Sequence, residues 1–161
     1  MSTQRPTGEV WAELGDMEEE QRESLMEQRY LELAALSEEE RQAQLRALAP
    51  VEYTLPDDKI WPFHRSRLRT WLRMDQSAAR RVADSYDEVM QQMPADVGMR
   101  RVSIVQTVAR SLPLEEEERL RDLVPRVFGE TPHGVTEAPE SLRETVGDKQ
   151  RKPWWRFWAA D

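Results

Sequence analysis

The residues with the most distinctive chemistry lie at the end of the sequence, in positions 149–161. Three of the six tryptophans, one phenylalanine and four cations occur there. An indole ring combines an apolar body with one N–H donor, so it suits a boundary between water and an apolar environment. We therefore predict that this segment binds a partner protein or a membrane surface. The residues expected to make these contacts are Lys149, Arg151, Lys152, Trp154, Trp155, Arg156, Phe157 and Trp158.

Three destinations fit the composition of this segment. At a membrane, each cation near an anionic leaflet contributes roughly 1 kcal/mol, so four cations give marginal, reversible attachment. In physical type the segment resembles short interfacial peptides rich in Trp and Arg. On a partner protein, the aromatic side chains would be anchors inserted into pockets. The third destination is the protein's own helical body.

A second set of cations, Arg65, Arg69 and Arg73, recurs every four residues along one predicted helix. Such a stripe could bind the phosphates of a nucleic acid or an acidic partner. It could also pair with glutamates of the same chain, which has 31 acidic residues against 23 basic ones. The formal net charge is −8, whereas a typical nucleic-acid-binding domain is basic. Internal pairing is therefore the favoured interpretation, and nucleic acid is a disfavoured partner.

Catalytic and metal-binding patterns are sparse in the sequence. Nucleophilic catalysis needs a base beside a Ser, Thr or Cys, and the chain has two histidines and no cysteine. His64 lies on an apolar helical face and is interpreted as a core residue, while His133 lies between Pro132 and Gly134. Glycine-rich phosphate loops do not occur in the sequence. We therefore predict that the protein is not an enzyme and has no metal site and no cofactor.

The composition of the 161-residue chain favours an all-α fold. Apolar residues make up 39% and charged residues 34%, which suits slim helices with one buried stripe. The alternating β-branched runs that mark strands do not occur. The predicted fold is a small antiparallel helical bundle with an acidic N-terminal helical extension and a mostly irregular C-terminal tail. The sequence contains neither a signal peptide nor a membrane span. We expect a cytoplasmic protein, with the cytoplasmic face of a membrane as an alternative location.

Apolar spacing and capping residues divide the chain into five parts. The predicted parts are a flexible leader (1–15), an acidic helical extension (16–50), a helical bundle core (57–129), a linker (130–148) and the basic, Trp-rich tail (149–161).

The extension is predicted to contain two helices. Asp16 is the expected N-cap of the first helix, whose narrow apolar stripe leaves it facing solvent or a partner. Ser37 and Glu40 form a capping-box pattern for the second helix, which is expected to end before Pro50. A similar Glu-Glu-Glu-Arg segment lies at the start of the last core helix. We interpret the two segments as similar helix starts and not as a duplicated domain.

Together these observations predict a non-enzymatic peripheral helical subunit, adaptor or assembly factor of a larger, membrane-associated protein complex. The tail is the expected attachment segment. One alternative is a helical regulatory module that binds nucleic acid through the arginine stripe. Another is a small helical chaperone-like stress protein. The oligomeric state and the identity of the partner are not set by the sequence.

Overall fold

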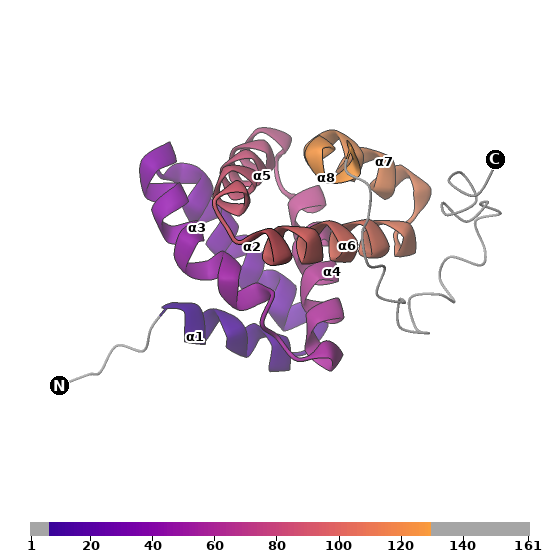
Figure 1. Cartoon of the computed structure of the whole chain (residues 1–161), viewed down its shortest axis with the longest axis horizontal. Helices are drawn as coiled ribbons and strands as arrows, with labels where there is room; N and C mark the ends of the chain where they lie inside the picture. The colour runs from indigo at the N-terminus through magenta and orange to yellow at the C-terminus, as the bar shows by residue number, and fades with distance from the viewer. Residues whose placement is uncertain (1–6, 130–161) are drawn as a thin grey trace.

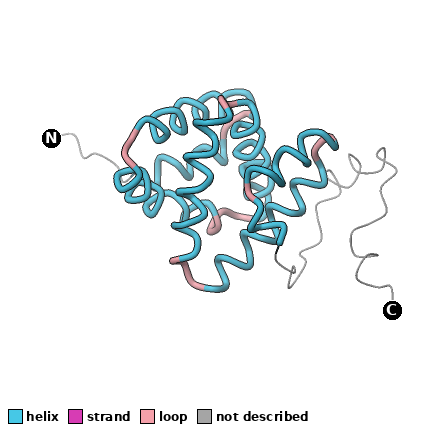
Figure 2. Tube along the Cα trace, turned by 90° about the horizontal axis from the view of Figure 1, so that it is seen from above, coloured by secondary structure: helices cyan, strands magenta, loops and turns pink. Residues whose placement is uncertain are grey.

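The computed structural model of the chain is an all-α bundle, as predicted. The structure describes residues 7–129, and within them short loops join helices without any strand (Figure 2). The predicted linker and tail lie outside the described residues. No helix in the described part is both long and apolar enough to cross a bilayer.

The predicted leader contains ordered helical structure after residue 6. Residues Thr7–Ala12 form α1, and Glu13–Asp16 form the 3-10 helix η1. Trp11 and Leu14 are buried in the core, 6% and 4% exposed. The prediction of a flexible leader over 1–15 is therefore wrong for residues 7–15, because two apolar side chains there anchor the segment to α3 and α4.

The next two helices are α2 (Glu19–Ala35) and α3 (Glu38–Glu52). Ser37 and Glu40 form the predicted capping box. Asp16 does not cap α2 and instead forms an ion pair with Lys59. Helix α3 continues through Pro50 to Glu52, which extends the predicted helix by three residues.

Three long helices follow, α4 (Asp57–Arg73), α5 (Gln76–Gln91) and α6 (Ala95–Ser111). The last predicted core helix is divided in two, into α7 (Leu114–Leu123) and α8 (Pro125–Gly129). Pro125 explains the division, because proline lacks the N–H needed to continue a helix and restricts the residue before it.

Six successive helices begin at intervals of 19 residues. The first helical positions of α2 to α7 are Glu19, Glu38, Asp57, Gln76, Ala95 and Leu114. Each is preceded by an N-cap in extended conformation, and three of these caps are prolines, whose fixed φ suits the place. The residue before each cap is always a Met or a Leu, namely Met17, Leu36, Leu55, Met74, Met93 and Leu112. The chain is thus built from a recurring 19-residue helical unit, a regularity that the sequence interpretation missed.

The packing follows the same regularity. The most extensive contacts join helices two apart in the chain, α2 with α4 and α3 with α5 (Figure 1). At equivalent positions of these two pairs, the Arg22 Nε donates to Ser66 Oγ at 2.9 Å and the Arg41 Nε donates to Ser85 Oγ at 2.8 Å.

One hydrophobic core runs through the described chain, from Trp11 in α1 to Val127 in α8. Helix α2 contributes Met26, Tyr30 and Leu33, each fully buried. The two helices of the acidic extension therefore belong to the core, which reaches well beyond the predicted range 57–129. The narrow apolar stripe of α2 faces α4 and α5 of the same chain.

Candidate functional site

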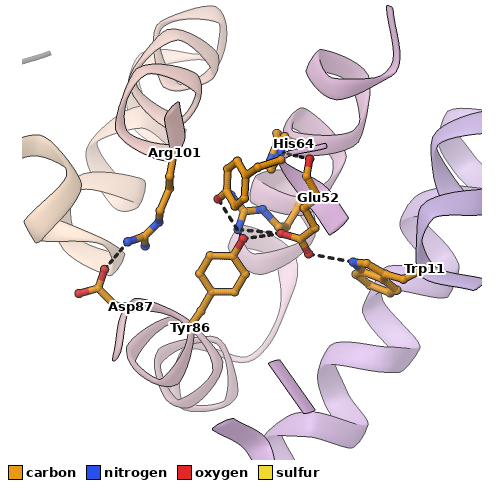
Figure 3. Close-up of polar contacts among 8 residues, drawn as sticks. Trp11, Glu52, His64, Tyr86, Asp87 and Arg101 are labelled. Carbon is orange, nitrogen blue, oxygen red and sulfur yellow. Dashed lines mark hydrogen bonds and ion pairs between the residues drawn. The ribbon is translucent and has the colours of Figure 1, made fainter. Parts of the chain in front are cut away.

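The strongest concentration of polar side chains is buried in the middle of the bundle, around Glu52 (Figure 3). The Trp11 Nε1 donates to Glu52 Oε1 at 2.8 Å, and the Tyr86 hydroxyl donates to Glu52 Oε2. The hydroxyls of Tyr86 and Tyr53 are hydrogen-bonded at 2.9 Å. Arg67 Nη1 lies 3.6 Å from Glu52 Oε2. Helices α1, α3, α4 and α5 each supply part of this Glu52 cluster.

Arg67 is the cation of the cluster and is fully buried. Its guanidinium lies 4.5 Å from the ring centre of Tyr86 and 4.9 Å from that of Trp71. A cation over an aromatic face is attracted by the ring, and the attraction is stronger when water is excluded. Arg101 from α6 approaches the Tyr86 ring at 5.3 Å and pairs with Asp87 at 2.5 Å.

The electrostatics of the cluster follow from its burial. Burial raises the pKa of the Glu52 carboxyl, against the lowering effects of Arg67 and of the hydrogen bonds from Tyr86 and Trp11. Burial also raises the pKa of the Tyr86 hydroxyl well above its usual value. Glu52, Arg67 and Tyr86 are each at most 1% exposed, so the cluster lies inside the bundle. The cluster joins four helices, and the Arg67 guanidinium is held there by charge and ring contacts, since none of its three nitrogens makes a hydrogen bond among the described residues.

His64 lies beside this cluster and is fully buried, as its apolar-face position predicts. Its Nε2 is 3.0 Å from the carbonyl oxygen of Glu52, and its ring stacks on Tyr53 with centroids 4.8 Å apart. Burial, and secondly the charge of Arg67, lower the pKa of His64 well below its usual range. The imidazole is therefore neutral, and Nε2 carries the proton that the carbonyl accepts.

The predicted arginine stripe lies on the side of α4 that faces α2. Arg69 Nη1 is 2.8 Å from Glu19 Oε1 and 3.8 Å from Glu23 Oε1. Arg73 Nη1 is 2.7 Å from Glu23 Oε2. Arg65 is half-buried and makes no ion pair in the described part of the chain. Two of the three arginines thus make the internal pairs that the sequence interpretation favoured.

The other predicted site residues fall outside the described residues. These are His133 and the tail contacts Lys149, Arg151, Lys152, Trp154, Trp155, Arg156, Phe157 and Trp158. Within residues 7–129, no group of three or more His, Asp or Glu side chains is placed to hold a metal ion.

The sequence interpretation missed the Glu52 cluster, although the 19-residue unit places Glu52 at a position that is buried in the other helices. Glu52 occupies the place that Leu33, Trp71 and Met90 occupy in α2, α4 and α5, and all four side chains are buried. Arg67 is three residues from His64 and four from Trp71, so helical spacing places it on the same buried face.

Two adjoining surface hollows border α5, one between α5, α6 and α8 and the other between α3, α5 and the junction of α7 with α8. One hollow, of about 420 Å³, is lined by three methionines together with Gly98 and Val127. The other, of about 390 Å³, is lined by four carboxylates and a single guanidinium. Asp87 and Arg126 line both hollows and form an ion pair at 3.4 Å between them. We call the two the methionine hollow and the acidic hollow.

Comparison of the chain with protein-family models, with curated proteins and with solved structures finds no match.

Proposed function

We propose that this protein is a non-enzymatic helical adaptor or subunit of a larger, membrane-associated complex, and that it attaches through residues 149–161. The observation that carries the proposal is the internal pairing of the arginine stripe with Glu19 and Glu23 of α2. A phosphate would have to displace carboxylates that these guanidiniums already hold. This supports attachment through the cations of the tail, which lie among four aromatic residues.

The energetics of the tail support a combined attachment to lipid and protein. Four cations contribute about 4 kcal/mol at an anionic surface, at roughly 1 kcal/mol each, which gives only marginal binding. Tryptophan and arginine are also the residues that most often dominate protein interfaces, when they fill pockets on the partner. A protein contact would therefore turn weak membrane association into stable assembly.

Vesicle flotation of the full chain tests the membrane part of the proposal. We expect the chain to float with vesicles that contain phosphatidylserine and much less with phosphatidylcholine alone, because the cations need an anionic surface. The variant Trp154→Ala/Trp155→Ala/Trp158→Ala should lose about tenfold or more in bound fraction, since it loses the interfacial burial of three indoles.

A matched control removes three exposed apolar side chains from the helices instead. This variant is Leu25→Ala/Leu31→Ala/Leu114→Ala, whose residues are 38%, 45% and 49% exposed. It should float like the unaltered chain. Equal flotation of the tryptophan variant and the control would remove the tail from membrane attachment.

A further inference from the structure

We propose that the tail, residues 149–161, docks in the methionine and acidic hollows of its own chain when it is not attached to a partner. The inference rests on the proposed function of the tail as the attachment segment. It adds a place on the helical body where that segment is held. Attachment to a partner and docking on the body then exclude each other, because both use the same indoles and cations.

The place where the described chain ends favours this occupant. Arg126 lines both hollows and Val127 lines the methionine hollow, and Gly129, two positions later, is the last described residue. Residues 130–148 are 19 positions, and a random coil of 19 residues would have an r.m.s. end-to-end distance of about 25 Å by the ~5–6 Å × √n rule. A tethered ligand at such a range has an effective concentration on the order of millimolar. Even weak contacts would therefore be occupied.

Charge complementarity favours the same occupant. The acidic hollow is lined by Glu38, Asp84, Asp87 and Glu88 with one cation, Arg126, so its net charge is 1 − 4 = −3. The tail carries four cations and Asp161, so its net charge is 4 − 1 = +3. Asp84 is exposed, and Glu38 accepts a hydrogen bond from the Gln42 amide at 3.3 Å but forms no ion pair with a described residue. These two carboxylates are the ones most readily paired with the tail.

The methionine hollow suits the aromatic part of the tail. Met90, Met93 and Met99 line it, and Met99 is 49% exposed. Methionine is flexible and polarizable, so it adapts to aromatic rings and makes favourable sulfur–aromatic contacts. An indole seated here would cover apolar surface that is now open to water. The two hollows adjoin, as the aromatic and cationic residues of the tail do in sequence.

Methyl NMR of the full chain with ¹³C-labelled methionine tests the docking. A docked indole shifts nearby methyl signals through its ring current. Comparing the unaltered chain with Trp154→Ala/Trp155→Ala/Trp158→Ala, we expect signal changes at Met93 and Met99. Met26 and Met74 lie in the core and serve as internal controls. Unchanged signals at Met93 and Met99 would overturn the docking.

A charge variant tests the acidic hollow independently of the indoles. Glu38→Gln/Asp84→Asn should move the Met93 and Met99 signals toward those of the tryptophan variant, because the tail is released. The matched control Glu20→Gln/Glu115→Gln neutralises two exposed acids elsewhere and should leave them in place. Equal signals for the charge variant and its control would contradict the role of the acidic hollow.

A mixing experiment separates this docking from capture of another copy's tail. Unlabelled unaltered chain is added to labelled tryptophan variant. If the tail docks on its own chain, the Met93 and Met99 signals of the labelled variant stay where they are. If these signals move toward those of the unaltered chain as more unlabelled chain is added, the tail of one copy binds another copy, and docking within one chain is overturned. Flotation separates the docking from the proposed function. Methyl shifts without vesicle or partner binding would leave docking standing and remove the attachment role.

Discussion

At the scale of single residues, His64 shows how a potential base is used as a structural group. It is neutral, fully buried and donates through Nε2 to the Glu52 carbonyl. Protonation would add a hydrogen at Nδ1, which has no hydrogen-bond partner among the described residues. A charged imidazole would also face the Arg67 guanidinium, whose charge helps to lower the His64 pKa. The fold therefore selects the neutral ring.

The depressed pKa of His64 predicts a loss of stability in acid. Below about pH 6.5, the usual histidine pKa, His64 is protonated in the unfolded chain but stays neutral in the folded chain. The free energy of unfolding therefore falls as the pH falls, until the lower pKa of the folded chain is reached. The slope is at most about 1.4 kcal/mol per pH unit for one proton. Urea unfolding of the unaltered chain and of His64→Gln between pH 7.5 and 5 measures it.

The second histidine provides the control for this prediction. We expect His64→Gln to flatten the dependence below pH 6.5, since the amide can still donate to the Glu52 carbonyl but does not titrate. His133→Gln, outside the described residues, should behave like the unaltered chain. Parallel curves for His64→Gln and the unaltered chain would show that His64 does not titrate in this way.

At the scale of elements, the Glu52 cluster connects side chains from four helices that are separated in the sequence. Trp11 of α1, Glu52 of α3, Arg67 of α4 and Tyr86 of α5 meet at one buried point. Breaking a buried pair leaves one charge without compensation, which typically costs about 3–5 kcal/mol. We therefore expect Arg67→Met to destabilise the bundle by about this amount in urea unfolding, and Glu52→Gln/Arg67→Met to recover part of the loss.

An exposed pair is the matched control for the cluster. Arg29 Nη1 lies 3.1 Å from Glu32 Oε2 on the surface of α2. Surface pairs contribute about 0–1 kcal/mol, and Arg29 also donates a hydrogen bond to the Gln44 side chain, so Arg29→Met should cost at most about 2 kcal/mol. If Arg67→Met costs no more than Arg29→Met, the cluster does not hold the helices together.

Much of the element pattern could be predicted from the sequence, and the reasons for the misses are physical. The apolar helical face that contains His64 and the capping box at Ser37 predicted their helices correctly. Glu52 is not among the predicted site residues because Pro50 predicts a helix end, whereas α3 continues through Pro50 to Glu52. Trp11 was missed because only tertiary packing orders the short helix around it. The 19-residue spacing of helix starts was the unused signal in the sequence.

The arginines account for a second difference between the sequence prediction and the structure. Residue type alone assigns Arg67 to the surface, because arginine is almost never fully buried unless it is paired. Its partners come from other helices, so the pairing depends on tertiary structure. The arginine stripe was easier to interpret, since the excess of acids made internal partners for Arg69 and Arg73 the favoured outcome.

At the scale of the whole molecule, one continuous core holds all the described helices. The acidic α2 and α3 are not appendages, because Met26, Tyr30 and Leu45 are at most 1% exposed within that core. The two hollows inferred to hold the tail lie on either side of Asp87 and Arg126, the methionine hollow toward α6 and the acidic hollow toward α3. We propose that this body carries the tail, holds it when it is free and positions it when it is attached.

The most direct test of the attachment role is quantitative co-purification of the native full chain with its partners. The unaltered chain is compared with Trp154→Ala/Trp155→Ala/Trp158→Ala and with the control Leu25→Ala/Leu31→Ala/Leu114→Ala. The account predicts that the unaltered chain and the control recover the same partner proteins and membrane lipids, and that the tryptophan variant loses them about tenfold or more. Equal recovery of the partners by all three chains would contradict it.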